Sequence, residues 1–173
     1  IDLNAQAALT GSNSREDFSS IENAIGSLNG DLIIGSNGAN LLSGLAGSDE
    51  LQGKSGNDTL IGGPGQDFLF GEGDADRFVF QTLSDSRVGA ADIIFDFSHA
   101  AGDRIDLSAI DAVTNVGGDQ QFTFIGTQAF GGVAGQLRFS GGFLSADVNG
   151  DGRADMSIEV RNLTSMQLSD FAL

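Results

Sequence analysis

The stretch that decides the fold runs from residue 26 to residue 79 and reads GSLNGDLII GSNGANLLS GLAGSDELQ GKSGNDTLI GGPGQDFLF GEGDADRFV when divided every nine residues. The first position of each unit is glycine, and the fourth is glycine in four of the six units. The sixth position is aspartate, or asparagine in the second unit, and the eighth is always a large apolar residue. The repeated unit is therefore G-x-x-G-x-D-x-U-x, where U is large and apolar.

The spacing of glycine and apolar residues in this unit predicts a coil. Glycine at the first and fourth positions allows positive φ and close backbone approach, so six residues can form a tight turn that aims carbonyl oxygens inward. The other three residues are then a minimal strand with one apolar side chain facing inward. Two units complete a coil of eighteen residues, with strands stacked roughly 4.8 Å apart. We therefore predict an all-β protein built on a parallel β-roll.

In such a roll, the turns of alternate units lie on the same side and place their acidic residues in two rows. Carboxylates about 5 Å apart repel by about 3 kcal/mol per pair at an effective dielectric of 20. Calcium accepts six to eight carboxylate and carbonyl oxygens in flexible geometry, so it can complete a roll that is unstable without it. The predicted side-chain ligands are Asp31, Asn40, Asp49, Asp58, Asp67 and Asp76. The predicted glycine positions of the sites are Gly35, Gly38, Gly44, Gly47, Gly53, Gly56, Gly62, Gly65 and Gly71.

The candidate sites differ in the ligands they offer. Asp49 with Asp67, and Asp58 with Asp76, combine two carboxylates with mostly intact glycine positions, so these pairs are the best sites. The pair of Asn40 with Asp58 has lost one charge, and Asp31 with Asp49 has Asn29 at a glycine position. A disordered glycine-rich linker is the alternative, but such linkers do not keep an inward aliphatic residue every nine positions.

The composition excludes several partners. The chain has 173 residues, a formal net charge of −16, only 8 basic residues and no cysteine. We therefore expect neither nucleic-acid binding nor binding to an anionic membrane through a basic patch, and no disulfide or thiolate metal site. No apolar run approaches the length of about 18 residues that membrane insertion requires. The chain begins at Ile1 without methionine, so we expect it to be the C-terminal part of a longer protein.

The chain divides into three predicted segments. Residues 1–25 are a lead-in that packs on the roll, residues 26–79 are the roll, and residues 80–173 are a β-rich, mostly antiparallel C-terminal cap. In the cap, short runs of alternating apolar and polar residues are separated by Gly-Gly pairs, which favours an antiparallel meander on the open end of the roll.

Beyond the repeats, particular stretches resemble a known family. The runs IENAIGS (21–27), DADRFVF (74–80), DIIFDF (92–97) and GDRIDLSAID (102–111), together with the nonapeptides, resemble the C-terminal domain of serralysin-type metalloproteases and related RTX exoproteins. That resemblance implies a calcium-loaded roll followed by an end that carries an uncleaved signal for type I secretion. It makes Asp170, Phe171, Ala172 and Leu173 candidates for the signal. The alternative is that these residues form an ordinary edge strand at the end of the chain. One segment can be both a secretion signal and an edge strand.

Other acidic residues lie outside the repeats. Asp147, Asn149, Asp151 and Asp155 stand at positions 1, 3, 5 and 9 of a loop with a glycine at position 6, as in an EF-hand. Position 12 is Ile158 instead of glutamate, so a plain hairpin turn stays an open alternative to a calcium site. Asp85 follows Asp67 by eighteen residues and could close one more site. Several other aspartates after the repeats are either further calcium ligands or solvated and turn-forming residues. They are Asp92, Asp96, Asp103, Asp106 and Asp111.

Catalysis has little support in the sequence. The single histidine, His99, cannot form an H-E-x-x-H zinc site, and no G-x-S-x-G motif occurs. We predict no enzymatic activity for this chain itself, which is compatible with a protease or lipase domain upstream. The leading hypothesis is a calcium-binding module of a secreted, extracellular protein that folds on calcium binding. Its partners would be calcium, the type I secretion apparatus and an upstream domain. The alternative is a calcium-stiffened binding module for an extracellular polysaccharide or protein, whose sign would be a basic or aromatic stripe on one outward face.

Overall fold

The fold is given by a computed structural model that describes residues 8–10, 14–16 and 22–173. The predicted lead-in, residues 1–25, lies largely outside the described residues. Within it, β1 (Ala8–Thr10) and β2 (Ser14–Glu16) pair antiparallel. Among the described residues, no helix is long and apolar enough to cross a membrane.

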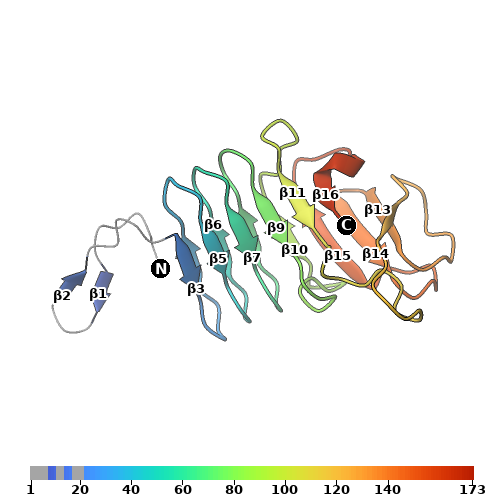
Figure 1. The fold of residues 1–173 in the computed structure, drawn as a ribbon, viewed down its shortest axis with the longest axis horizontal. Helices are drawn as coiled ribbons and strands as arrows, with labels where there is room; N and C mark the ends of the chain where they lie inside the picture. Colours follow the sequence, from blue (N-terminus) through green and yellow to red (C-terminus); the bar gives the residue numbers. More distant parts are fainter. Residues whose placement is uncertain (1–7, 11–13, 17–21) are drawn as a thin grey trace.

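The nonapeptide units form a parallel β-roll, as predicted (Figure 1). Each unit gives one strand of three residues, and successive strands alternate between two sheets. Leu42 of one strand lies opposite Leu60 in the next strand of the same sheet, which is the expected coil of two units. The six units give β4 (Leu32–Ile34), β5 (Leu41–Ser43), β6 (Glu50–Gln52), β7 (Thr59–Ile61), β8 (Phe68–Phe70) and β9 (Arg77–Val79), and β3 (Asn23–Ile25) precedes the first unit.

The core of the roll is a column of the eighth-position side chains. The middle residue of each strand points inward and its two neighbours point outward, because side chains alternate along a strand. Complete burial of each Leu or Ile contributes about 1.5–3 kcal/mol, so a three-residue strand has one such contribution to hold it. These side chains are at most 1% exposed: Ile33, Leu42, Leu51, Leu60, Leu69 and Phe78.

The roll continues after the nonapeptide spacing has ended. β10 (Asp92–Ile94) pairs parallel with β8, and β11 (Arg104–Asp106) pairs parallel with β9. Ile94 and Ile105 are fully buried and extend the central column. Longer connections therefore replace the six-residue turns, while the strand position in each sheet is kept.

The C-terminal part combines an antiparallel meander with parallel strand pairs, and it is not a separate layer on the end of the roll. β13 (Gln136–Ser140), β14 (Phe143–Asp147) and β15 (Met156–Val160) form the predicted meander, with β12 (Thr123–Phe124) at its edge. β15 also pairs parallel with β10, so the meander extends one sheet of the roll edge to edge. This happens because β10 would otherwise leave an open row of backbone hydrogen-bonding groups.

The chain ends in the other sheet. A single 3₁₀ turn, Leu168–Asp170, leads into β16 (Phe171–Ala172), which pairs parallel with β11. Both sheets of the roll thus receive a strand from the last quarter of the chain (Figure 1). Our proposed segment boundary at residue 79 stays a proposal, and parallel pairing crosses it at β8–β10 and β9–β11.

Candidate metal centre

The repeat aspartates form two ladders, one at the turns on each side of the roll. In each ladder the carboxylate Oδ1 accepts a hydrogen bond from the backbone N–H of the ladder residue one coil earlier. For example, Asp49 N–H donates to Asp67 Oδ1 at 2.8 Å, and Asp58 N–H donates to Asp76 Oδ1 at 2.9 Å. The lower members follow the same rule, since Asp31 N–H donates to Asp49 and Asn40 N–H donates to Asp58. The structure therefore brings all six predicted side-chain ligands into the two rows.

Each ladder has one more member than the nonapeptide spacing predicts. Asp67 N–H donates to Asp92 Oδ1 at 3.0 Å, and Asp76 N–H donates to Asp103 Oδ1 at 3.0 Å. The ladders are thus Asp31, Asp49, Asp67, Asp92 and Asn40, Asp58, Asp76, Asp103, called below the first and second ladder. Sequence reasoning gave Asp92 and Asp103 little weight because their spacing is wrong. The signal that locates them is an aspartate two residues before a buried apolar residue, here Ile94 and Ile105.

Asp85, which has the expected eighteen-residue spacing from Asp67, is not in the ladder. Its carboxylate accepts hydrogen bonds from the N–H groups of Gln81 and Thr82 and from the Thr82 hydroxyl. It therefore caps its own turn. Spacing alone fails here because the G-x-x-G pattern that forms the six-residue turn is missing at residues 80–83.

The second carboxylate oxygen of the central ladder members has no hydrogen-bond partner. These buried, unpartnered atoms are the Oδ2 atoms of Asp49, Asp58, Asp67, Asp76 and Asp92. An unpaired carboxylate oxygen away from water is costly, and five in two regular rows need a common explanation. A cation in the turns would supply one.

The outer ladder members differ from the central ones. Asp31 Oδ2 accepts hydrogen bonds from the Ser27 N–H at 2.6 Å and from the Ser27 hydroxyl at 2.9 Å. Asn40 Oδ1 accepts from the Ser36 N–H at 2.6 Å. Both residues belong to the sites that we ranked as weaker on sequence grounds, and in the structure their oxygens already have partners.

The first-position glycines are needed for space and not for positive φ, which corrects our expectation. A Cβ on Gly53 would contact Asp58 Oδ2 and would stand 2.9 Å from the carbonyl oxygen of Gly71 in the next coil. The glycine therefore opens the cradle in which a carboxylate and a carbonyl oxygen converge. Positive φ occurs instead at the second position of the unit, at Leu45, Lys54, Gly63 and Glu72, and at some fourth positions such as Gly47.

Burial disfavours the charged form of the ladder carboxylates when no cation is near them. It raises the pKa of Asp58 to about 6 and that of Asp67 to about 7, although one backbone N–H bond to each carboxylate opposes the shift. The pKa of Asp76 rises to about 7 and that of Asp92 to about 9 for the same reason. Repulsion from other ladder aspartates adds to each of these last three shifts. Clustered, perturbed carboxylates of this kind are typical of ion sites.

The donor set fits a hard cation bound largely by backbone oxygen. Among the described residues, no three His, Cys, Asp or Glu side chains converge on one point. The turns instead offer one free carboxylate oxygen on each of the five central ladder members. They also offer inward carbonyl groups, such as that of Gly62, whose oxygen would lie 2.8 Å from a Cβ added to Gly44. Oxygen-only ligation by carboxylates and carbonyls suits calcium and does not suit zinc or other soft metals.

The Asp147 loop differs from the ladders because its oxygens have partners. Asp147 is fully buried, and its carboxylate accepts from the N–H groups of Gly150 and Gly152. Asp155 accepts from the Val148 N–H and the Asn149 amide, while Asp151 accepts from the Arg153 N–H. These bonds close a turn between β14 and β15. Calcium binding at Asp147, Asn149, Asp151 and Asp155 stays a prediction, and no carboxylate oxygen of this loop is buried without a partner.

The candidate secretion residues lie in β16 and in the turn before it. Asp170 is 3% exposed, and its carboxylate lies 2.8 Å from His99 Nδ1 and accepts from the Gln167 N–H. Phe171 is buried opposite Ile105, and the Ala172 carbonyl accepts from the Leu107 N–H. The last strand is therefore part of the folded sheet.

Comparison with known proteins agrees with this geometry. The family model of the RTX calcium-binding nonapeptide repeat matches residues 25–60 and 43–78. The R3 subunit of the Azotobacter vinelandii mannuronan C5-epimerase AlgE6, solved in solution, is 26% identical to the chain, with a TM-score of 0.58 over 85% of this chain and 80% of that one. The R2 subunit of the same enzyme is 22% identical, with a TM-score of 0.54 over 88% of this chain and 92% of that one, and shares the fold. No curated protein sequence matches the chain. Residues 25–78 therefore carry RTX calcium-binding nonapeptide repeats, and these repeats form the β-roll of the chain.

Proposed function

We propose that this chain is a non-catalytic module of a larger extracellular protein, and that calcium drives its folding after export. The observation that carries the proposal is the set of buried Oδ2 atoms without partners on Asp49, Asp58, Asp67, Asp76 and Asp92. Folding without calcium buries these carboxylates at a cost, and folding with calcium gives them a ligand.

The calcium level would decide which state the chain adopts. Extracellular calcium modules bind with Kd of about 10⁻⁴–10⁻³ M, well above the free calcium inside a cell. At about 10 mM calcium, each such site stabilises the folded state by about 1.4–2.7 kcal/mol. Because interior members such as Asp67 lie between two neighbours of their ladder, we expect binding to be cooperative.

We further propose that residues Asp170–Leu173 are read by a type I secretion apparatus before the chain folds. Support comes from their place in the fold, since Asp170 and Phe171 are buried in the folded state. A receptor can reach them only while β16 is unpaired, which calcium-poor conditions favour. Deleting these four residues should abolish export from a host with a type I system. Normal export of the truncated chain would contradict this part of the proposal.

The presence of an upstream domain is also a proposal. Several apolar side chains on the first coils face outward, where a covering surface would bury them. These are Ile25, Leu28, Leu32, Leu41 and Leu45, each more than 40% exposed.

Calcium titration followed by far-UV circular dichroism tests the main proposal. We expect a cooperative transition from a disordered to a β spectrum as calcium rises from chelator to about 10 mM, a range that spans the Kd values of extracellular modules. Magnesium at equal concentration is the control, because it prefers rigid octahedral sites and keeps its water. A full β spectrum in chelator would contradict calcium-driven folding.

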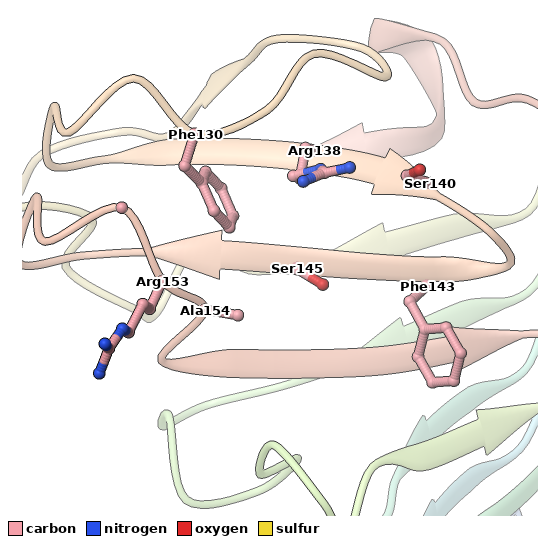
Figure 2. Close-up of a pocket in the computed structure, with 8 residues that line it drawn as sticks. Phe130, Arg138, Ser140, Phe143, Ser145, Arg153 and Ala154 are labelled. Atoms are coloured by element: carbon pink, nitrogen blue, oxygen red, sulfur yellow. The ribbon is translucent and has the colours of Figure 1, made fainter.

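A second candidate function, binding of an extracellular polysaccharide, is favoured by one observation. The outer face of β13 and β14 and the turn after them carry a groove with arginine and phenylalanine side chains, the kind of surface that such a module needs (Figure 2). The similar subunits belong to an enzyme whose name indicates that it acts on the polysaccharide mannuronan. Both functions are compatible, since a roll folded by calcium would hold the meander in place.

A further inference from the structure

The meander carries a groove that the calcium ladders do not explain. It has a volume of about 440 Å³ and lies on the outer face of β13 and β14 and the turn after them. Its lining includes Phe130, Arg138, Ser140, Phe143, Ser145 and Arg153. Figure 2 shows Arg138 and Ser140 along β13, Ser145 on β14, Phe143 at one end and Arg153 at the other.

Arg138 is held in position without being neutralised. Its guanidinium carbon lies 5.6 Å from the centroid of the Phe130 ring, a cation–π distance. In the sheet it stands opposite Ser145, whose hydroxyl is 3.5 Å from that of Ser157 on β15. Among the described residues, the ion pairs involve Lys54, Arg77, His99 and Arg161, so Arg138 has no carboxylate partner. Its charge and its hydrogen-bond donors stay available.

The absence of acids from the groove is unusual for this chain. The chain has a net charge of −16, yet none of the residues that line the groove is acidic. Glu159, opposite Phe143 in the sheet, is bonded by Arg161 at 2.9 Å. Arg153 adds a second guanidinium, with no carboxylate pairing to it, although its side chain points away from Arg138 in Figure 2. The groove is thus a local positive site on an acidic protein.

The aromatic and hydroxyl groups further restrict the class of ligand that fits the groove. Phe143 is 41% exposed, and its ring offers a flat apolar surface at one end of the groove. Ser140 and Ser145 offer hydroxyl groups that both donate and accept hydrogen bonds. A planar guanidinium binds a carboxylate with two parallel hydrogen bonds. A ligand that uses all three features has a carboxylate, several hydroxyls and an apolar ring face.

We propose that this groove binds a carboxylated oligosaccharide, with a uronate carboxylate on Arg138 and a sugar ring face on Phe143. The proposal rests on the second candidate function and gives it a location. An acidic peptide fits less well, because the groove lies on the face of the sheet, whereas an extended peptide adds to a sheet edge, here at β12.

Calorimetric titration of the calcium-saturated chain with an oligouronate tests the proposal. We expect binding, and the Arg138→Gln variant should weaken it by about tenfold or more, because a charge-assisted double hydrogen bond is lost. Arg104→Gln is the matched control: Arg104 is exposed on β11 in the other sheet and has no ion pair among the described residues. It removes the same charge and should change affinity by less than about twofold, since an exposed charge at this distance is screened. Phe143→Ala should weaken binding without changing its salt dependence.

Three outcomes would overturn the proposal. Equal losses in the two arginine variants would mean diffuse electrostatic attraction. Tighter binding of poly-glutamate than of the oligouronate would assign the groove to acidic peptides. A lack of oligouronate binding would show that the groove does not bind carboxylated oligosaccharides. Circular dichroism of each variant in calcium shows whether it is folded, so failure of the groove is distinguishable from failure of calcium-driven folding.

Discussion

The roll and the meander bury aspartate in opposite ways. In the roll, Asp58 is 1% exposed, and its Oδ1 accepts one N–H bond while its Oδ2 has no partner. In the meander turn, Asp147 is also fully buried, but two glycine N–H groups satisfy its two oxygens. The same residue type therefore stabilises one region outright and leaves the other incomplete until a cation binds.

The strands show the same contrast. A roll strand has three residues and buries one side chain, whereas β15 has five residues and buries four of them. A short strand with one buried aliphatic residue gains little against the entropy of ordering its turn. We infer that the roll depends on its ladders and that the meander depends on its own packing.

Calcium removal should have the largest effect and should separate the two regions. In chelator, we expect backbone amides of β5–β9 to lose most of their protection from hydrogen exchange, because several sites each contribute about 1.4–2.7 kcal/mol. Amides in β13–β15 should keep more of theirs. Exchange measured by mass spectrometry with and without calcium checks this. Uniform loss over both regions would show that the meander needs the roll through the β10–β15 pairing.

The substitutions Asp58→Asn and Asp147→Asn should act in different ways. Asp58→Asn removes a buried charge, so we expect weaker, less cooperative calcium binding but a folded state that is no less stable in chelator. Asp147→Asn replaces an acceptor oxygen by an amide group facing an N–H, which should cost about 1–3 kcal/mol with or without calcium. Calcium titrations and thermal melts of both variants measure the contrast. An unchanged calcium titration of Asp58→Asn would remove this residue from the ligand set.

Acidity should stabilise the calcium-free roll. Burial first, and then repulsion between ladder members, raises the folded-state pKa of Asp67, Asp76 and Asp92 to about 7, 7 and 9, above the ordinary value of 3.8. The folded state then binds more protons than the unfolded chain between the two pKa values, so its stability falls as pH rises from about 4 to about 9 and is regained on acidification. With calcium the trend reverses, because protons compete for the same oxygens. Melting temperatures in chelator that drop between pH 8 and pH 5 would contradict this prediction.

His99 and Asp170 provide an intermediate case. Like Asp147, Asp170 is buried with both oxygens in use, but one partner is a side chain, His99 Nδ1 at 2.8 Å. His99→Ala should leave that oxygen without its partner and destabilise β16 by about 1–3 kcal/mol. Faster exchange of the Leu107 amide, which donates to Ala172, is the measurement. The calcium titration should change little, because the hydrogen-bond partners of His99 are Asp170 and Ser165, and its charge acts on the ladders only through Asp103 at the end of the second ladder.

The sequence predicts the roll well and its continuation poorly, for physical reasons. A buried apolar side chain every nine residues specifies both register and inward face, so Ile33 through Phe78 could be placed without coordinates. Asp92 and Asp103 could not, because longer connections keep the strand positions and lose the spacing. The edge-to-edge join of β15 to β10 is a long-range pairing, which local patterns do not encode.

The second position of the nonapeptide gives the smallest expected effect and tests a detail that the glycine pattern conceals. Leu45 has φ of 76° and Gly63, its equivalent one coil later, has φ of 94°. A side chain in this region costs about 1–2 kcal/mol, while glycine adds about 0.5–1 kcal/mol of unfolded-state entropy. Leu45→Gly should therefore raise the melting temperature in calcium slightly. Gly63→Ala should lower the melting temperature, and by a larger amount, because the added Cβ would meet the Leu45 carbonyl oxygen. If both changes destabilise the protein equally, the contacts of the Leu45 side chain contribute more stability than the positive φ of Leu45 costs.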